Sequence, residues 1–225
     1  MEIIDLTHRL EAGMPFWPTH AKYERIPVET LQVALAEHAR VCVDEHTGTH
    51  VDAPSHFING APSVDQVPLT RFAGCGRAID ARCVGPNGVV DADFLVQWEE
   101  QNGRLDAGDV VLFFFGWSLK WNQDQSGPSF NEDWPGVNES ACSRLIEREV
   151  AAVGTDALSI DPANTTTFEG HRTLLHGTIP IFENVDNLDR VLGQPFTFMG
   201  WPLHIVGGSG SPVRAVAMVE DTARK

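Results

Sequence analysis

The chain has 225 residues, a formal net charge of −15 at pH 7, 42% apolar residues and 21% charged residues. The length allows one domain or two small ones, and the lack of a repeat or a Gly-, Ser- and Pro-rich linker favours a single domain spanning residues 1–225. The two fractions are those of an ordinary soluble protein, which disfavours a disordered chain or a coiled coil. The acidity disfavours nucleic acids and anionic membranes as partners, because phosphates and lipid headgroups also carry negative charge.

The start of the chain reads MEIIDLTHRLEAGM, which lacks the basic leader and apolar run of a signal peptide. No stretch approaches the ~20 apolar residues that span a membrane. The four cysteines form no CxxC pair, so we expect buried free thiols in a reducing cytoplasm rather than disulfides or a thiolate zinc site. They are Cys42, Cys75, Cys83 and Cys142. The protein is therefore predicted to be cytoplasmic.

Strands are predicted where short apolar runs are bounded by polar residues or glycine. In chain order these runs cover residues 3–7, 41–44, 77–80, 109–115, 152–160, 203–206 and 213–219. The run 41–44 is expected to lead directly into a histidine-rich segment. Residues 207–212 contain Gly207-Gly-Ser-Gly210, which weakly resembles a phosphate-binding loop, but without a lysine or a helix signal we interpret them as a turn.

Two helices are predicted between these strands. The first covers residues 91–101, with Asp91 or Asp93 as its cap and an apolar stripe that includes Trp98. The second begins at residues 138–140 and turns Cys142 and Leu145 inward. Strands outnumber helices and do not alternate strictly with them, so the sequence predicts a mixed α/β fold with a sheet-rich core.

The polar stretch from Trp117 to Trp134 holds a third tryptophan, Trp121. Loops of this length are uncommon unless they form a lid or a binding surface. Large aromatic side chains also need something to pack against. A cover over a site and a plain surface insertion are left as equal alternatives.

Four metal-ligating side chains lie close together in the segment HTGTHVDAPSH, at positions 46, 50, 52 and 56. Gly48 and Pro54 argue against a continuous helix. The even offsets would send all four side chains to one face of an extended strand. Imidazole nitrogen and carboxylate oxygen bind Zn²⁺ at roughly 2.0–2.2 Å and also suit Mn²⁺ or Fe²⁺. We therefore interpret the segment as a metal site, the alternative being a polar strand face in solvent.

A second group lies downstream and comprises His171, His176 and Glu183. These residues could complete the ligand set of the first ion or bind a second one, whereas Glu183 could instead pair with Arg172 on the surface. Asp161 follows a predicted strand, where capping, turn formation and a role in the site are all open.

The order of these motifs resembles the cyclase-like metal-dependent hydrolases, which include bacterial kynurenine formamidases and isatin hydrolases. The resemblance covers nearly the whole chain. Its motifs are the opening Ile-Asp-Leu-Thr, Trp17-Pro18, the HTGTHVDAPSHF segment, Glu183-Asn184 and the closing Gly-Ser-Pro-Val-Arg. It implies a single compact swivelling β/β/α domain with a mixed sheet core. It also implies assembly into homodimers or homotetramers.

The resemblance also implies roles for individual residues. His46, His50 and Asp52 would bind a first ion. Asp52 would reach a second ion together with His171, and Glu183 would bridge the two. Zinc is the expected metal and manganese the alternative, with one or two ions per subunit.

Three further residues complete the prediction. His56 would be the general acid/base, Trp17 would line the substrate pocket, and His176 has no clear family role beyond a position behind the ligands. The sequence departs from the formamidases after Trp17-Pro18, where Thr19-His20 replaces their usual Gly-Asp. That departure lies where substrate would be held.

The predicted reaction is hydrolysis of an amide C–N bond in a small aromatic or cyclic amide by metal-activated water. Hydrolysis of an ester or a lactone at the same site is the alternative, and a non-catalytic metal-binding protein is a third hypothesis. The sequence holds no Gly-x-Ser-x-Gly element that would indicate a serine hydrolase.

Overall fold

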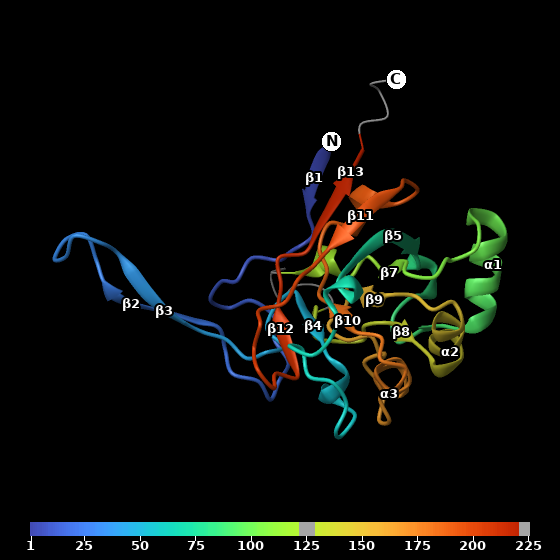
Figure 1. The fold of residues 1–225 in the computed structure, drawn as a ribbon, viewed down its shortest axis with the longest axis horizontal. Coiled ribbons are helices and arrows are strands. Elements are labelled where there is room, and N and C mark those ends of the chain that lie inside the picture. Colours follow the sequence, from blue (N-terminus) through green and yellow to red (C-terminus); the bar gives the residue numbers. More distant parts are fainter. Residues whose placement is uncertain (122–128, 221–225) are drawn as a thin grey trace.

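The computed structural model describes residues 1–121 and 129–220. Within these ranges nine strands form one sheet, in the order β1-β13-β11-β5-β7-β9-β10-β4-β12 (Figure 1). The strands of this sheet are β1 (Glu2–Asp5), β4 (His50–Asp52), β5 (Ala73–Asp80), β7 (Val110–Phe114), β9 (Ala152–Thr155), β10 (Ile181–Glu183), β11 (Phe196–Met199), β12 (Gly210–Pro212) and β13 (Val216–Val219). This is the mixed α/β fold that the sequence predicts.

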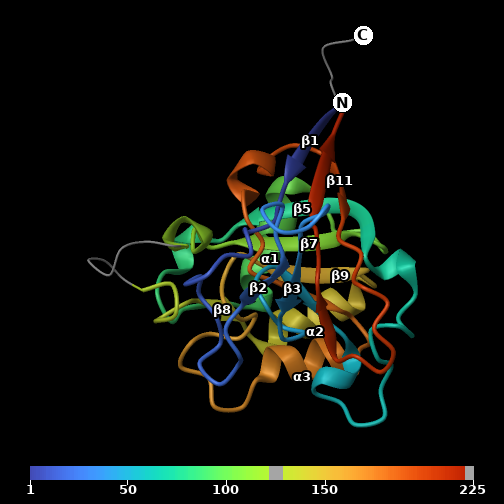
Figure 2. The ribbon, with the colours of Figure 1, turned by 90° about the vertical axis from the view of Figure 1, so that its left-hand side faces the viewer.

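The centre of the sheet is parallel and its two sides are antiparallel. Strands β5, β7, β9 and β10 run parallel to one another, and Figure 2 shows the first three stacked across the molecule. All five residues of β7 are buried, because both faces of the sheet are covered. This explains why the sequence there is an unbroken apolar run.

Alternate residues of β7 supply the two cores. Val111 and Phe113 belong to a cluster with Leu95, Leu145 and Leu174, one from each of three helices. These helices are α1 (Ala92–Asn102), α2 (Glu139–Glu147) and α3 (Glu169–His176), and Figure 1 shows them on one side of the molecule. The other residues of β7 pack in a second cluster with side chains such as Phe72, Phe182 and Phe198.

Both predicted helices are confirmed, with caps that the sequence indicates. Asp91 accepts a hydrogen bond from the Phe94 amide at 2.8 Å, and Asn138 accepts one from the Ala141 amide at 3.1 Å. The buried Glu99 then joins α1 to α2, because its carboxylate accepts hydrogen bonds from the guanidinium groups of Arg144 and Arg148.

A hairpin projects from the body on the side away from the helices (Figure 1). It consists of β2 (Glu24–Glu29) and β3 (His38–Cys42), which pair with each other in a separate sheet. Of the predicted strand at 41–44, only Val41 and Cys42 are in a strand, and they belong to this hairpin instead of leading straight into the histidine segment. Its exposed large apolar residues are Ile26, Val28, Leu31, Val33, Leu35 and Val41. A remaining short pair, β6 (Val89–Val90) and β8 (Gly136–Val137), is parallel.

The predictions near the C-terminus are partly wrong. Residues 203–206 form no strand, and the predicted turn instead contains β12, which pairs with β4 opposite His50 and Asp52. An edge strand with a neighbour on one side needs few apolar residues, so its sequence resembles a turn. The four cysteines are free as predicted, but only Cys142 is buried.

Candidate metal centre

The segment from His46 to His56 is not the continuous strand that its even spacing predicts. His46 lies in a turn, Gly48 has φ +62°, and within this segment only residues 50–52 form a strand. Pro54 then begins a 3-10 helix that ends at His56. The four side chains are brought together by this turn, strand and helix in succession, and only His50 and Asp52 share a strand face.

The second group of candidate ligands meets the first through strand pairing. Strand β10 runs antiparallel to β4 and sets Glu183 directly opposite His50. His171 enters from the first turn of α3. Asp52 and His171 are 119 residues apart in the sequence, yet Asp52 Oδ2 lies 3.1 Å from His171 Nε2.

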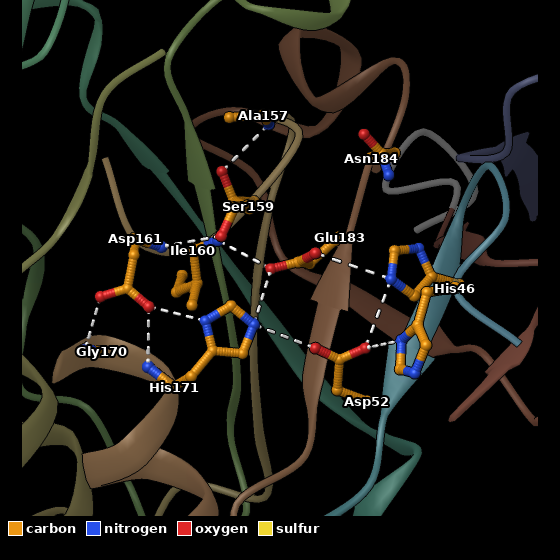
Figure 3. A network of polar contacts seen from close by, with 12 residues as sticks. His46, Asp52, Ala157, Ser159, Ile160, Asp161, Gly170, His171, Glu183 and Asn184 are labelled. Carbon is orange, nitrogen blue, oxygen red and sulfur yellow. Dashed lines mark hydrogen bonds and ion pairs between the residues drawn. The ribbon is translucent and has the colours of Figure 1, made fainter. Parts of the chain in front are cut away.

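Asp52 lies at the centre of the cluster, as Figure 3 shows. Its Oδ1 is 2.6 Å from His46 Nδ1 and 3.3 Å from His50 Nε2. The carboxylate of Glu183 lies 3.6 Å from His50 Nε2 and 3.3 Å from His171 Nε2. Three imidazoles and two carboxylates, all largely buried, therefore direct ligand atoms into one small volume.

Two of the imidazoles have their outer nitrogen fixed by a group that only accepts hydrogen bonds. His50 Nδ1 donates to the Gly48 carbonyl at 2.8 Å, and His171 Nδ1 donates to Asp161 at 2.6 Å. Each ring therefore carries its hydrogen on Nδ1 and can present the lone pair of Nε2 to the carboxylates. Lone pairs facing carboxylates favour a cation between them, so the residues fit a divalent metal ion.

The electrostatics of the site agree with this fit. Burial lowers the pKa of His50, but the hydrogen-bonded Asp52 and the charge of Glu183 outweigh it and raise that pKa above its usual value. Burial acts in the same way on His171, whose pKa is raised well above the usual value by Asp161, Asp52 and Glu183. The site thus attracts positive charge.

His56 is set apart from the other histidines. Its ring stacks on that of His46 at 3.9 Å between centroids. Burial, with the neighbouring histidines, lowers the pKa of His56 to about 4. Its ligand atom also lies within 4.8 Å of those of His46 and Asp52, so its position allows either a proton-transferring group or a further ligand.

A cavity of about 200 Å³ opens above these residues. Four aromatic side chains, among them Trp17, Phe57 and Phe168, line its wall together with histidines and other polar residues. Trp17 packs edge-on against Trp134 at 6.0 Å, and the Trp134 indole donates to the Asp161 carbonyl. The tryptophan-rich loop therefore supports the wall of the cavity from behind, while its residues 122–128 lie outside the described ranges.

Sequence reasoning underestimated Asp161. Its carboxylate accepts hydrogen bonds from the Gly170 and His171 amides at the start of α3 and from the His171 ring. Asp161 therefore caps the start of α3 and also holds the ring of His171, one of the candidate ligands. His20 lines the cavity, in agreement with the prediction that the Thr19-His20 departure lies where substrate would be held, and so does Asn184 of the Glu183-Asn184 motif, for which no role was predicted from the sequence.

His176 does not join the site. It lies exposed at the last residue of α3, and it is not among the described residues that line the cavity. The alternative pairing of Glu183 with Arg172 on the surface does not occur either. Glu183 is buried, and the Arg172 guanidinium donates to the Thr167 carbonyl.

Comparison with known proteins places this architecture in a family. The family model Cyclase, described as "Putative cyclase", matches residues 4–162. The chain belongs to the cyclase family. It is 29% identical to a kynurenine formamidase from Salinibacter ruber, over 96% of this chain and 97% of that one.

Two further similar proteins are isatin hydrolases. An isatin hydrolase from Roseibium aggregatum is 27% identical, covering 78% of this chain and 72% of its own. The solved structure of isatin hydrolase A from Ralstonia solanacearum is 28% identical, superposes with a TM-score of 0.86, and covers 97% of this chain and 92% of that chain. The fold predicted from the motifs is thus that of known hydrolases.

Proposed function

We propose that the protein is a metal-dependent hydrolase that cleaves an amide C–N bond in a small aromatic or cyclic amide. The observation that carries this proposal is the buried group of three imidazoles and two carboxylates at the base of an aromatic-lined cavity. The similar proteins support it, since a formamidase and an isatin hydrolase both act on amide bonds.

The ligands of the ion or ions would be His46, His50, Asp52, His171 and Glu183. Asp52 is shared between the two candidate groups, one with His46 and His56 and one with His50 and Glu183, so there is room for one or two ions per subunit. Imidazole and carboxylate favour zinc, with manganese as the alternative. When bound, such an ion lowers the pKa of water towards ~7 and polarises the substrate carbonyl.

The residues of the chain then hold the substrate and move the protons. His56 lies in the wall of the cavity and stacks on His46, next to the ligands. It would take a proton from the attacking water and deliver one to the leaving nitrogen. Trp17, together with Phe57 and Phe168, would hold the planar part of the substrate and exclude water.

The test is metal analysis coupled to a hydrolysis screen. The purified protein is stripped with a chelator and reloaded with zinc or manganese separately. Each form is then assayed on N-formylkynurenine, isatin, simple lactams and a lactone matched to one of the lactams. Activity on an amide that returns with one metal supports the proposal. Turnover of the lactone alone would assign an ester hydrolase, and stoichiometric metal without turnover would contradict catalysis.

We further propose a homodimer or homotetramer of single-domain subunits spanning residues 1–225. The hairpin β2–β3 supports association, because an isolated two-stranded sheet with exposed apolar side chains gains stability when a partner covers it. Light scattering after gel filtration tests this, with Leu31→Glu and Val33→Glu expected to shift the mass towards one subunit.

A cytoplasmic location is also proposed, and the four free cysteines support it. In the described part of the chain, no helix is long and apolar enough to cross a membrane. Cell fractionation tests the location.

A further inference from the structure

We propose that Glu45 and Ser209 act as positioning residues that fix the tautomer of His46. This inference deepens the proposed function and rests on it, because it concerns one of the proposed metal ligands. It assigns a role to the Gly207-Gly-Ser209-Gly210 segment, which the sequence alone presents as a simple turn.

The three side chains form a chain of hydrogen bonds across 163 residues of sequence. Ser209 Oγ lies 2.6 Å from Glu45 Oε2 and 2.9 Å from His46 Nε2. The backbone amide of Ser209 also donates to Glu45 Oε2 at 2.9 Å. The other nitrogen of the ring, Nδ1, is the one that faces Asp52.

The direction of these hydrogen bonds follows from their chemistry. A carboxylate only accepts, so the single hydroxyl hydrogen of Ser209 is donated to Glu45. The hydroxyl oxygen is then an acceptor towards the ring, which requires a hydrogen on His46 Nε2. The lone pair of Nδ1 is consequently left for a cation next to Asp52. His46 would therefore bind through Nδ1, whereas His50 and His171 present Nε2.

The segment also fixes the ring by shape. A Cβ atom at Gly210 would lie 2.6 Å from His46 Cε1 and 3.0 Å from Nδ1, so the glycine lets the strand lie directly against the imidazole. The backbone of Ser209 is itself held, because its carbonyl accepts from the Ala53 amide at 2.8 Å. Both the acceptor and the ring are thus in place before a metal binds.

The consequence is measured first as metal affinity. Ser209→Ala removes the acceptor, and loss of such an outer partner typically weakens metal binding ~10–100-fold. Zinc competition with a chromophoric chelator gives this value for each variant. Glu45→Ala should weaken binding less, and the double variant should be no weaker than Ser209→Ala alone, because Glu45 acts through the hydroxyl. Ser209→Thr, which keeps a hydroxyl, should restore binding.

The second measurement reads the tautomer itself. Long-range ¹H–¹⁵N spectra of metal-free and zinc-loaded protein should both show a hydrogen on His46 Nε2, protected from solvent exchange, and the zinc-loaded form should show none on Nδ1. In Ser209→Ala this protection should disappear. Ser211→Ala is the matched control, because Ser211 lies two residues further along, in β12, and among the described residues its hydroxyl is hydrogen-bonded to the Leu203 amide and the Pro212 carbonyl. It should leave affinity and spectrum unchanged.

The outcomes separate this inference from the proposed function. A hydrogen on Nδ1 of His46 in the zinc-loaded wild type, or unchanged zinc affinity in Ser209→Ala, would overturn the assignment even if the enzyme is active. If the losses of zinc affinity add up in the double variant, the inference that Glu45 acts through the Ser209 hydroxyl is wrong. A wild-type protein that binds no metal refutes the proposed function, whereas the protected Nε2 hydrogen is still read in the metal-free spectrum.

Discussion

Replacing Asp161 with asparagine turns one carboxylate oxygen into an NH₂ group without changing the size of the side chain. The carboxylate accepts from the Gly170 amide through Oδ1, at 2.7 Å, and from the amide and ring of His171 through Oδ2, at 3.0 and 2.6 Å. An asparagine has one acceptor oxygen, so it cannot satisfy both sides. One N–H group at the start of α3 must face an NH₂ group instead.

The cheaper orientation keeps the oxygen towards His171. It then loses the bond to Gly170, which costs about 1 kcal/mol as a lost helix cap, and the negative charge near the helix start, which costs about 0.3–1 kcal/mol. The remaining bond to the His171 ring is neutral and roughly half as strong. We therefore expect Asp161→Asn to lose about 1–2 kcal/mol of stability and ~10-fold in metal affinity. Asp161→Leu, which offers no acceptor, should approach ~100-fold.

The assays are urea unfolding and chelator competition on the same preparations. Asp156→Asn is the control, because Asp156 is an equally buried aspartate that accepts from Phe115 and Ser118 and does not contact His171. It should leave metal affinity at the wild-type value. If Asp161→Asn binds zinc as tightly as the wild type, the orientation of His171 by Asp161 is refuted, whatever happens to stability.

Three further predictions concern catalysis and stability. His56→Ala should lower kcat by ~10²–10⁴ with full metal content by elemental analysis, whereas loss of the ion would make His56 a ligand. The pKa of Glu99 is lowered to about 2, chiefly by Arg148, so its stabilisation is complete above about pH 4.5 and lost towards pH 2. Glu99→Gln should flatten the fall in unfolding free energy over that range, and parallel curves would contradict this. Gly154→Ala would place a Cβ atom 2.9 Å from Phe182 Cβ, so it should lower the free energy of unfolding, measured in urea, by about 1–3 kcal/mol. An unchanged free energy of unfolding would show that the two strands can move apart to accommodate the methyl group.

The central strands and the first two helices were predictable because their signals are local. The apolar run of β7 reflects burial on both faces of the sheet. The caps Asp91 and Asn138 act on amides three residues ahead, within the same stretch of sequence. Such interactions need no information from distant parts of the chain.

The failures occur where the partner is distant. Residues 210–212 form β12 only because β4 lies beside them, and nothing in Gly-Ser-Pro indicates a strand. The even spacing from His46 to His56 was read as one strand, but Gly48 and Pro54 bend the chain on either side of β4. The four side chains do come together as predicted, but through a turn, a short strand and a 3-10 helix rather than along one strand.

The sequence by itself determined the chemical inventory of the candidate site, since a run as dense as HTGTHVDAPSH indicates its candidate ligands by residue type and spacing. Only the tertiary structure decided which nitrogen of each ring faces inward, because that depends on the acceptor behind it. For His171 this acceptor is Asp161, and for His46 it is Ser209, which is 163 residues away in the chain. An imidazole has two nearly equivalent nitrogens, and the fold selects between them by placing a hydrogen-bond acceptor beside one.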